Sequence, residues 1–345
     1  MGVNLKDLIV KKEISLSDLR GKILVIDAYN NLYQYLTTIR SIDGSVLTDK
    51  QGHVTSHLIG MFSRTTTLME QGLKVAFVFD GKAPEIKHKT WEKRTAIKQE
   101  ASLKLKVAEE AGDVGEMRKY AARTAILTRE MVADAKEVIT ALGLPIIQAP
   151  SEGEAQTSYM VKNGDAYASV SQDYDNLIFG CPLLIRNLSL EGKRKKAGKL
   201  AYTIVKPELI SLKDVLAELQ VDLEQLIVIA LLIGTDYNPG GIKGIGPKTA
   251  LKLVKEYKHD FNSLFQNVQW DTFNPEVSWK ELRDTIRNIP ITNNYALEWK
   301  PLHEQKLYHL LVEEHDFSEE RVKKKIESLQ QQAKAMTQKG LGSFF

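Results

Sequence analysis

The chain has 345 residues, a net charge of +3, and 43% hydrophobic against 26% charged residues. These values are typical of a soluble globular protein, and no apolar run reaches the roughly 18 residues that a membrane-spanning helix needs. The single cysteine, Cys181, excludes an intramolecular disulfide and a zinc site built on cysteines, which fits a reducing compartment.

Short apolar runs alternate with segments of helical spacing along the first two thirds of the chain. Such runs predict strands that are buried on both faces of a parallel sheet. We therefore expect an α/β fold with a mostly parallel central sheet and helices on both faces. The predicted strands are 22–27, 74–79, 145–148, 166–170 and 183–188, and the clearest helix is 56–70.

Acidic residues follow four of these runs. In open α/β sheets, ligands bind beyond the carboxyl ends of the strands, so we expect these acids to lie close together. Oxygen ligands without nearby cysteine or histidine suit Mg²⁺ or Mn²⁺. Each acid taken alone also has an ordinary interpretation as a turn residue or helix cap. The acids are Asp27, Asp80, the pair Glu152 and Glu154, and the pair Asp173 and Asp175.

The two acidic pairs differ in what they can do. Ser151-x-x-Glu154 matches a capping box, which gives Glu154 a structural role as well. Residues two apart on a regular helix point in different directions, so Glu152 and Glu154 can bind one ion directly only if the helix begins irregularly. Asp173 and Asp175 can face the same way if their segment is extended.

A basic, helix-prone segment follows Asp80. Seven Lys or Arg residues and two Glu residues lie between Lys87 and Lys106. Lys87, Arg94 and Lys98 share one helical face, which would form a cationic wall for phosphates. The alternative is an ordinary solvated helix face.

The segment from Asp214 to Gly234 is apolar and predicted to be helical, and it leads to Asp236, a further candidate for the acidic set. The glycine-rich stretch that follows does not match a phosphate-binding P-loop, because Pro247 stands before Lys248. It favours a helix-hairpin-helix turn at Gly244-Ile-Gly246, with Pro247 as the first residue of the next helix. The alternative is a simple glycine-rich turn.

The last residues place apolar side chains at the spacing Q-x-x-L-x-x-F-F, formed by Gln338, Leu341, Phe344 and Phe345. Apolar anchors of this kind often mark a docking site. The alternative is a disordered tail.

These motifs, in this order, closely resemble the flap endonucleases, structure-specific 5′ nucleases of DNA replication within the XPG/Rad2-like family. The resemblance covers nearly the whole chain and depends on VFDGK, APSEGEA, SQDYDNLIFG, GTDYN, GIKGIGPKTA and the tail. The compact form is similar to archaeal members. One small departure is Ala83, which precedes Pro84 where many members have two prolines.

The resemblance implies a site for two Mg²⁺ ions, or Mn²⁺ in their place, and contacts to branched DNA. Lys87 and Arg94 are implied to contact the scissile phosphate. The tail is implied to bind the sliding clamp PCNA through Gln338, Leu341, Phe344 and Phe345. The implied metal ligands are Asp27, Asp80, Glu152, Glu154, Asp173, Asp175 and Asp236; the expected DNA contacts are Gly2, Tyr29, Arg64 (for a 3′ flap), Lys98, Lys243, Gly244, Gly246 and Lys248.

We accordingly expect one 5′-nuclease domain over residues 1–330 and a flexible tail over 331–345. The expected activity is cleavage near the base of 5′ flaps, double flaps and nicked junctions, with 5′–3′ exonuclease activity, in Okazaki fragment maturation and repair. We expect a cytoplasmic, nucleoid-associated monomer without a membrane. The expected regions are an N-terminal nuclease region (1–105), an arch (82–130), an internal nuclease region (131–235) and a helix-hairpin-helix region (236–258).

Three other functions stay open from the sequence. The first is a related 5′ exonuclease or bubble-cutting nuclease on the same fold. The second is a non-catalytic scaffold for DNA junctions, which the complete acidic set opposes. The third is a Mg²⁺-dependent phosphatase, although an early D-x-D pair is missing and the hairpin turn and the tail would have no role.

Overall fold

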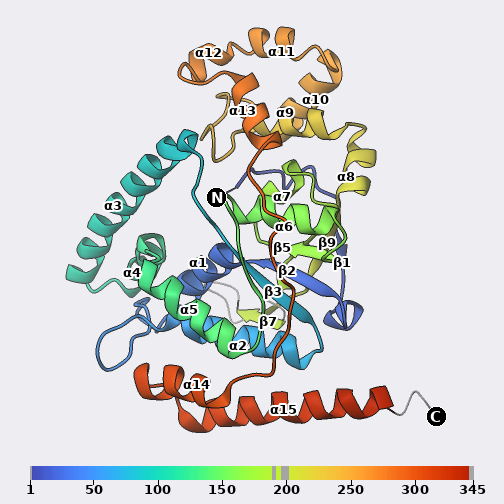
Figure 1. Ribbon diagram of the computed structural model, residues 1–345. Coiled ribbons are helices and arrows are strands. Elements are labelled where there is room, and N and C mark those ends of the chain that lie inside the picture. Colours follow the sequence, from blue (N-terminus) through green and yellow to red (C-terminus); the bar gives the residue numbers. More distant parts are fainter. Residues whose placement is uncertain (1, 189–191, 196–201, 342–345) are drawn as a thin grey trace.

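The computed structural model describes residues 2–188, 192–195 and 202–341; within these ranges, the side chains of 88–91, 93, 94, 192–195, 202–204 and 333–341 are outside the description. A seven-stranded sheet in the order β1-β9-β6-β5-β2-β3-β4 forms the centre of the molecule (Figure 1). The strands from β6 to β4 are parallel, while β9 and β1 pair antiparallel at one edge. The strands are β1 (Lys12–Glu13), β2 (Ile23–Asp27), β3 (Lys74–Phe79), β4 (Ile146–Gln148), β5 (Ala168–Val170), β6 (Leu183–Arg186) and β9 (Glu208–Ser211).

Helices cover both faces of this sheet, as the apolar runs predict. On β2, Leu24 and Ile26 pack in the cluster that includes α2 and α5, whereas Val25 packs with Met160 of α6 on the opposite face. This alternation follows from the two-residue period of a strand. The helices around the sheet are α1 (Ala28–Thr38), α2 (Ser56–Glu70), α5 (Arg129–Ala141), α6 (Gly153–Lys162), α7 (Asp175–Ile178), α14 (Glu304–Tyr308) and α15 (Glu319–Leu341), with a π-helix at His309–Glu314 between the last two.

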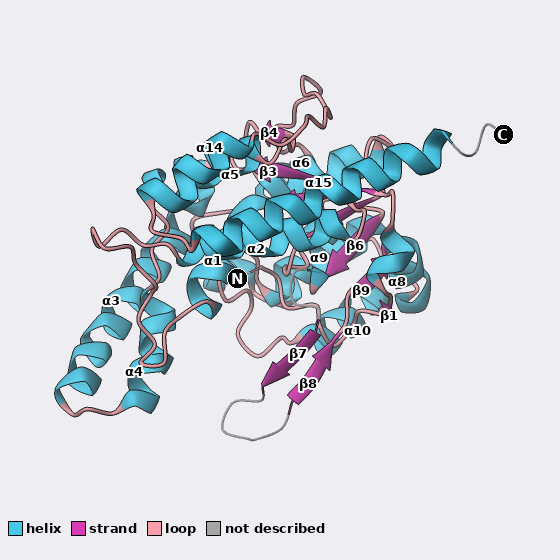
Figure 2. Ribbon diagram, turned by 90° about the horizontal axis from the view of Figure 1, so that it is seen from below, coloured by secondary structure: helices cyan, strands magenta, loops and turns pink. Residues whose placement is uncertain are grey.

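Two structures project from the central layers (Figures 1 and 2). On one side lies the arch, formed by η2 (Glu85–Lys87), α3 (His88–Glu110), α4 (Val114–Ala121) and η3 (Ala122–Thr124). The two arch helices are separated by residues 111–113, where Gly112 has φ +65°, whereas Gly115 lies within α4. A small hairpin of β7 (Gly192–Lys195) and β8 (Tyr202–Val205) projects separately from the arch, at the lower edge of Figure 2.

A helical layer built from the later part of the chain lies at the opposite end from α15 (Figure 1). The segment from Asp214 to Gly234 is helical, as expected, but it forms two helices. Gln220 ends the first in a left-handed conformation (φ 53°), and Asp222 caps the second. The helices of this layer are α8 (Leu212–Leu219), α9 (Leu223–Ile233), α10 (Pro247–Tyr257), α11 (Phe261–Asn267), α12 (Trp270–Phe273) and α13 (Trp279–Arg287).

The chain then returns along the molecule to α14 and α15. Trp299 of this returning segment donates a hydrogen bond from its indole nitrogen to the Val75 carbonyl of β3 at 3.0 Å. Helix α15 packs against α2 and extends to Leu341, so the backbone of residues 331–341 is helical. Within the described residues, no helix combines the length and the apolar character needed to cross a bilayer.

Candidate active site

The carboxyl ends of the parallel strands meet at one edge of the sheet, and the predicted acids lie there. Asp27 is the last residue of β2 and is only 2% exposed. Its carboxylate accepts a hydrogen bond from the backbone amide of Asn30 at 3.0 Å, and so it caps helix α1. Asp27 therefore caps a helix and is also a member of the acidic set.

Asp80, directly after β3, caps a helix from another part of the chain. The Gly153 amide, the first of α6, donates to Asp80 Oδ1 at 2.7 Å. The capping box expected from Ser151 and Glu154 is wrong: Glu152, not Ser151, is the cap residue, and no side chain of the α6 segment makes the capping hydrogen bond. The Gly153 amide, which has no partner within the first turn of the helix, is used to hold Asp80.

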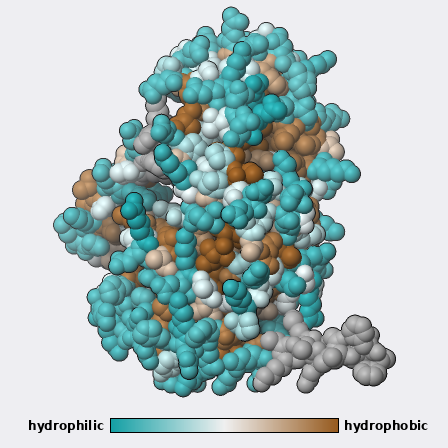
Figure 3. Space-filling view, in the orientation of Figure 1, coloured by the Kyte–Doolittle hydropathy of each residue, from teal (hydrophilic) through white to brown (hydrophobic). Residues whose placement is uncertain are grey.

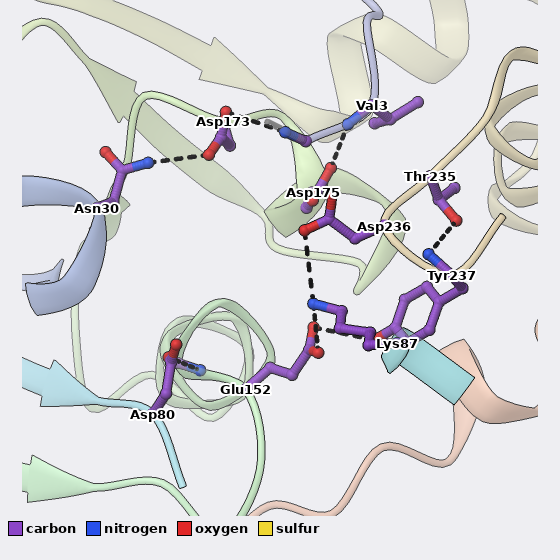
Figure 4. Close-up of polar contacts among 12 residues, drawn as sticks. Val3, Asn30, Asp80, Lys87, Glu152, Asp173, Asp175, Thr235, Asp236 and Tyr237 are labelled. Carbon is purple, nitrogen blue, oxygen red and sulfur yellow. Dashed lines mark hydrogen bonds and ion pairs between the residues drawn. The ribbon is translucent and has the colours of Figure 1, made fainter. Parts of the chain in front are cut away.

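The beginning of α6 also separates the two glutamates. Glu152 has extended backbone (φ −87°, ψ 134°), while Glu154 lies in the first helical turn. The start is therefore irregular, which is the condition under which the two side chains can serve one site. Gly153, the residue between the two glutamates, is hydrogen-bonded to Asp80, and Glu152 lies in the cluster drawn in Figure 4.

The loop after β5 presents Asp173 and Asp175 and is held from several directions (Figure 4). The beginning of the chain donates two backbone hydrogen bonds, from Gly2 to Asp173 Oδ1 at 3.3 Å and from Val3 to Asp175 Oδ1 at 2.7 Å. A Cβ on Gly2 would lie 2.5 Å from Asp175 Oδ1, so only glycine fits this close approach. Gly2, which we expected to contact DNA, therefore lies at the acidic site itself.

The far side of the same loop is held by Arg186 of β6. Its Nε donates to the Gln172 carbonyl at 3.0 Å, and its guanidinium stacks over the ring of Tyr174 at 4.2 Å. Arg186 also hydrogen-bonds to the Tyr174 hydroxyl. These contacts of the Arg186 guanidinium fix the orientation of the loop that carries the two aspartates.

Lys87, at the base of the arch, points into the acidic cluster. Its ammonium nitrogen lies 2.5 Å from Glu152 Oε1 and 3.7 Å from Asp236 Oδ2, and the side chain is 14% exposed. The Tyr237 hydroxyl donates to the other oxygen of Glu152 at 2.9 Å, and Lys87 lies over the Tyr237 ring at 5.1 Å. The structure thus brings Asp236 and Lys87 to the acids, as expected, and adds Tyr237, which the sequence analysis missed.

The crowded carboxylates resist ionisation. Burial, followed by the charge of Asp80, raises the pKa of Asp27 to about 8. Burial and then the charges of Asp173 and Asp236 raise the pKa of Asp175 to about 7, and burial raises the pKa of Asp80 to about 6 despite the Gly153 amide. Burial raises the pKa of Glu154 well above its ordinary value. The raised pKa values indicate that ionising these neighbouring carboxyl groups costs free energy. A bound cation would lower that cost.

Burial alone would lower the pKa of Lys87, but the charges of Glu152, Glu154 and Asp236 raise it above its ordinary value. One ammonium group cannot balance the whole acidic set. The oxygen-only donors, with their raised pKa values, fit a divalent cation of the Mg²⁺ type. Among the described residues, no three carboxylate or imidazole side chains already surround one point as ligands of a single ion, so binding would need small side-chain rotations.

The expected DNA contacts lie on several surfaces. Tyr29 packs edge-on against Phe79, with ring centroids 6.1 Å apart, and is partly buried. Tyr33, one helical turn later, is 39% exposed, and the Lys98 ammonium lies 5.5 Å from its ring. Tyr33 is therefore the more accessible aromatic, and the sequence analysis missed it because spacing alone does not show which face of α1 is covered.

Arg64 is exposed on α2 beside Ser63, which lines a cavity of about 650 Å³ between α2 and the beginning of α15. The same cavity is lined by Lys50, Arg321 and Lys325. The sequence analysis missed these cations, because Lys50 lies more than 260 positions before Arg321 and Lys325 in the chain.

The helix-hairpin-helix turn is formed as predicted. Gly244 has φ +87°, Gly246 caps α10, and Pro247 is in its first turn. Lys243, Gly244, Gly246 and Lys248 are all exposed. The first helix of the hairpin is α9, which ends before the region expected at 236–258.

Some expected site residues fall outside the description. The side chains of Arg94, Gln338 and Leu341 are not described, although their backbones lie in α3 and α15. Phe344 and Phe345 lie outside the described residues altogether.

Comparisons with known proteins agree along the whole chain. Residues 1–101 match the XPG N-terminal domain, and residues 143–236 match the XPG I-region. Flap endonuclease 1 of Pyrococcus horikoshii is 50% identical over 345 residues, covering 100% of this chain and 98% of the relative. Flap endonuclease 1 of Staphylothermus marinus is 52% identical over 333 residues, covering 95% of this chain and 94% of the relative.

Solved structures agree with the sequence relatives. The flap endonuclease-1 structure from Methanococcus jannaschii superposes with a TM-score of 0.73 at 41% identity, covering 96% of this chain and 98% of that one. The catalytic core of Rad2 in complex with DNA substrate has a TM-score of 0.69 at 21% identity, covering 95% and 100% of the two chains, and shows the shared fold. With both XPG regions present and half of the residues identical over its full length, the chain belongs to the flap endonuclease 1 family of XPG-type nucleases.

Proposed function

We propose that this chain hydrolyses a phosphodiester bond near the base of 5′ flaps in branched DNA, and that it also degrades 5′ ends exonucleolytically. The observation that carries the proposal is the burial of Lys87 between Glu152 and Asp236, in a cluster to which Asp80, Asp173 and Asp175 also belong (Figure 4). Membership of the family supports the substrate class. Flap removal during Okazaki fragment maturation and repair is the corresponding cellular role.

The acidic set would hold two Mg²⁺ ions, with Mn²⁺ able to replace them. When bound, such ions activate water and stabilise the leaving oxygen of a phosphodiester. Seven carboxylates exceed the needs of one ion, so some of them would act by orienting others. The proposed metal-binding residues are Asp27, Asp80, Glu152, Glu154, Asp173, Asp175 and Asp236.

Two cations at the base of the arch would act on the phosphate. Lys87 already points into the acidic cluster and keeps its proton, so it can stabilise negative charge that develops on a phosphate there. Arg94 lies seven positions later, in α3, the helix that Lys87 precedes. We assign it the same task.

Several surfaces would hold DNA without reading its sequence. The exposed turn at Gly244 and Gly246 would grip the duplex backbone, with Lys243 and Lys248 adding charge. Lys98 and an aromatic side chain of α1, Tyr33 or Tyr29, would contact the displaced strand. Arg64 and the neighbouring cavity with Lys50, Arg321 and Lys325 would receive a 3′ flap.

The end of the chain would bind the sliding clamp PCNA through Gln338, Leu341, Phe344 and Phe345. This proposal depends on the motif spacing alone. A DNA substrate implies a cytoplasmic, nucleoid-associated enzyme, and we propose that it is a monomer in the absence of DNA and clamp.

The test is cleavage of a 5′-labelled double-flap DNA with Mg²⁺, compared with duplex, nicked and bubble DNA. We expect cutting near the flap base, loss of cutting in Asp173→Asn with DNA binding retained, and no change in the matched control Asp271→Asn, an exposed residue of α12. Preferential cutting of bubbles would favour the related nuclease. Binding without cleavage by the unaltered protein would favour the scaffold.

A further inference from the structure

Asn30 lies in the first turn of α1, and both polar ends of its side-chain amide are bonded to the loop that carries Asp173; Figure 4 draws the bond to Asp173. Its Nδ2 donates to Asp173 Oδ2 at 2.9 Å. Its Oδ1 accepts from the backbone amide of Gln172 at 3.1 Å. These partners are 143 and 142 positions away along the chain, so the contacts exist only in the folded protein.

The backbone of the same residue contacts a second carboxylate. The Asn30 amide donates to Asp27 Oδ1 at 3.0 Å. Asp27 ends β2 and Asp173 follows β5, and these two strands are parallel neighbours in the sheet. A single residue therefore joins the acids at two adjacent strand ends.

An ordinary structural role does not account for this arrangement. Asparagine near a helix start usually bonds to backbone groups of its own segment. Among the hydrogen bonds of the described residues, the Asn30 side chain is bonded to the 172–173 loop instead. Asn31, the next residue, shows the local pattern, since its Nδ2 donates to the Asp27 carbonyl four positions earlier at 3.0 Å.

The chemistry of an amide suits the task. A neutral N–H donor uses one lone pair of Asp173 Oδ2 and leaves the other available to a cation. The amide oxygen, by accepting from Gln172, fixes the loop in the position from which the donor reaches Asp173. An amide does not ionise, so the Asn30 side chain adds no charge of its own to the site.

We propose that Asn30 is a positioning residue that sets the orientation of Asp173 relative to Asp27, and thereby the affinity of the site for divalent cations. The inference rests on the proposed metal-dependent function. Groups that orient metal-binding carboxylates typically change metal affinity or activity roughly 10- to 100-fold when they are removed.

The test compares Asn30→Leu, which keeps the shape and removes both hydrogen bonds, with the matched control Asn262→Leu, an exposed asparagine in the first turn of α11. Calorimetric titration with Mn²⁺ in the absence of DNA should show a loss of affinity of roughly 10- to 100-fold for Asn30→Leu only. Single-turnover cleavage should fall at low Mg²⁺ and recover as Mg²⁺ is raised. DNA affinity measured in EDTA should stay within about twofold.

A readout without metal completes the test. Hydrogen exchange of the Gln172 amide should become faster in Asn30→Leu than in the control, since its acceptor is gone. Asn30→Ser, which is shorter and still polar, gives the same comparison if the leucine variant folds poorly.

Equal Mn²⁺ affinity and equal Mg²⁺ dependence in the Asn30 variants and the unaltered protein would overturn the inference while leaving the proposed function intact. Absence of Mn²⁺ binding and of metal-dependent cleavage in the unaltered protein would overturn both. A loss of cleavage that high Mg²⁺ does not restore, with unchanged Mn²⁺ affinity, would show a role other than positioning.

Discussion

Lys87 shows at the scale of one residue how opposite charges can be buried together. Its ammonium group lies 2.5 Å from Glu152 Oε1, and the neighbouring acids keep it protonated against the effect of burial. A lysine in this environment is a fixed positive charge, and it cannot act as a base near neutral pH. Its useful chemistry is electrostatic stabilisation of a phosphate in the reaction.

Replacing Lys87 with alanine should therefore lower turnover more than binding. We expect kcat on a flap substrate to fall roughly 100- to 1,000-fold, as when one preorganised donor is removed from an active site. KM should change only a few-fold, since the interaction strengthens in the transition state. The matched control is Lys12→Ala, an exposed lysine in the edge strand β1. A rise in KM with unchanged kcat would contradict the assignment.

At the scale of an element, the beginning of α6 links helix formation to the acidic site. Its first amide donates to Asp80 rather than to a residue of its own segment. A Cβ on Gly153 would lie 2.6 Å from Asp80 Oδ1, so the approach depends on glycine. The helix and the carboxylate consequently fix one another's position.

Gly153→Ala should displace Asp80 and weaken metal binding. We expect the Mg²⁺ concentration that gives half-maximal cleavage to rise roughly tenfold or more, while circular dichroism shows a folded protein. The control Gly115→Ala, at an exposed site in α4, should be neutral or slightly stabilising, because alanine favours helix over glycine. An unchanged Mg²⁺ requirement in Gly153→Ala would show that the capping contact is not needed.

Helix α10 is a second element whose beginning determines its role. Gly246 and Pro247 leave free amides at its start, and Lys248 adds a charge beside them. Amides and a lysine at a helix start attract phosphate of any sequence. This predicts binding through the backbone of the duplex and a strong dependence on salt.

Lys248→Ala should reduce the slope of log affinity against log salt by about 0.9, the value for one phosphate contact on duplex DNA. Lys255→Ala, in the last turn of the same helix, should leave the slope unchanged. Binding isotherms at four or five salt concentrations measure both. Equal slopes for the two variants would place the duplex elsewhere.

At the scale of the whole molecule, the site is assembled from distant segments at a cost in stability. Asp27 and Asp175, with pKa values raised to about 8 and about 7, are held together by the fold. A carboxyl group whose pKa is raised on folding stabilises the folded state at low pH, where it is protonated. This stabilisation is lost as pH rises through the raised pKa. His57 has the opposite effect on stability. Burial lowers its pKa to about 4, so its contribution to stability grows as pH rises, and this growth is nearly complete at pH 6.5.

The metal-free protein should therefore lose stability between about pH 6.5 and 8, by at most about 1.4 kcal/mol per pH unit for each such carboxyl. Mg²⁺ should stabilise the protein more at pH 8 than at pH 6.5, since binding needs the ionised carboxylates. Chemical denaturation with EDTA or Mg²⁺ measures both effects. Asp27→Asn should show a flatter pH dependence in EDTA, and an equal dependence would contradict the shift at Asp27.

Local signals in the sequence were enough to predict much of the architecture. Apolar runs locate the parallel strands, because a strand buried on both faces needs apolar residues at every position. Pro247 and its flanking glycines predict the hairpin turn, because the conformations involved belong to those residues themselves. The acids at the strand ends were predicted as one group, because parallel strands end at the same edge of a sheet.

Only the tertiary structure decided how those residues are used. It showed that Asp80 caps α6 in place of Ser151, that Tyr33 is more exposed than Tyr29, and that Asn30 holds Asp173. The separation of α8 from α9 also required the left-handed conformation at Gln220. Sequence by itself thus determined the family, the strands and the acidic set. The division of roles within the site depends instead on contacts between residues that are 73 to 172 positions apart. Such contacts follow from how the elements pack, and no local pattern of residues encodes them.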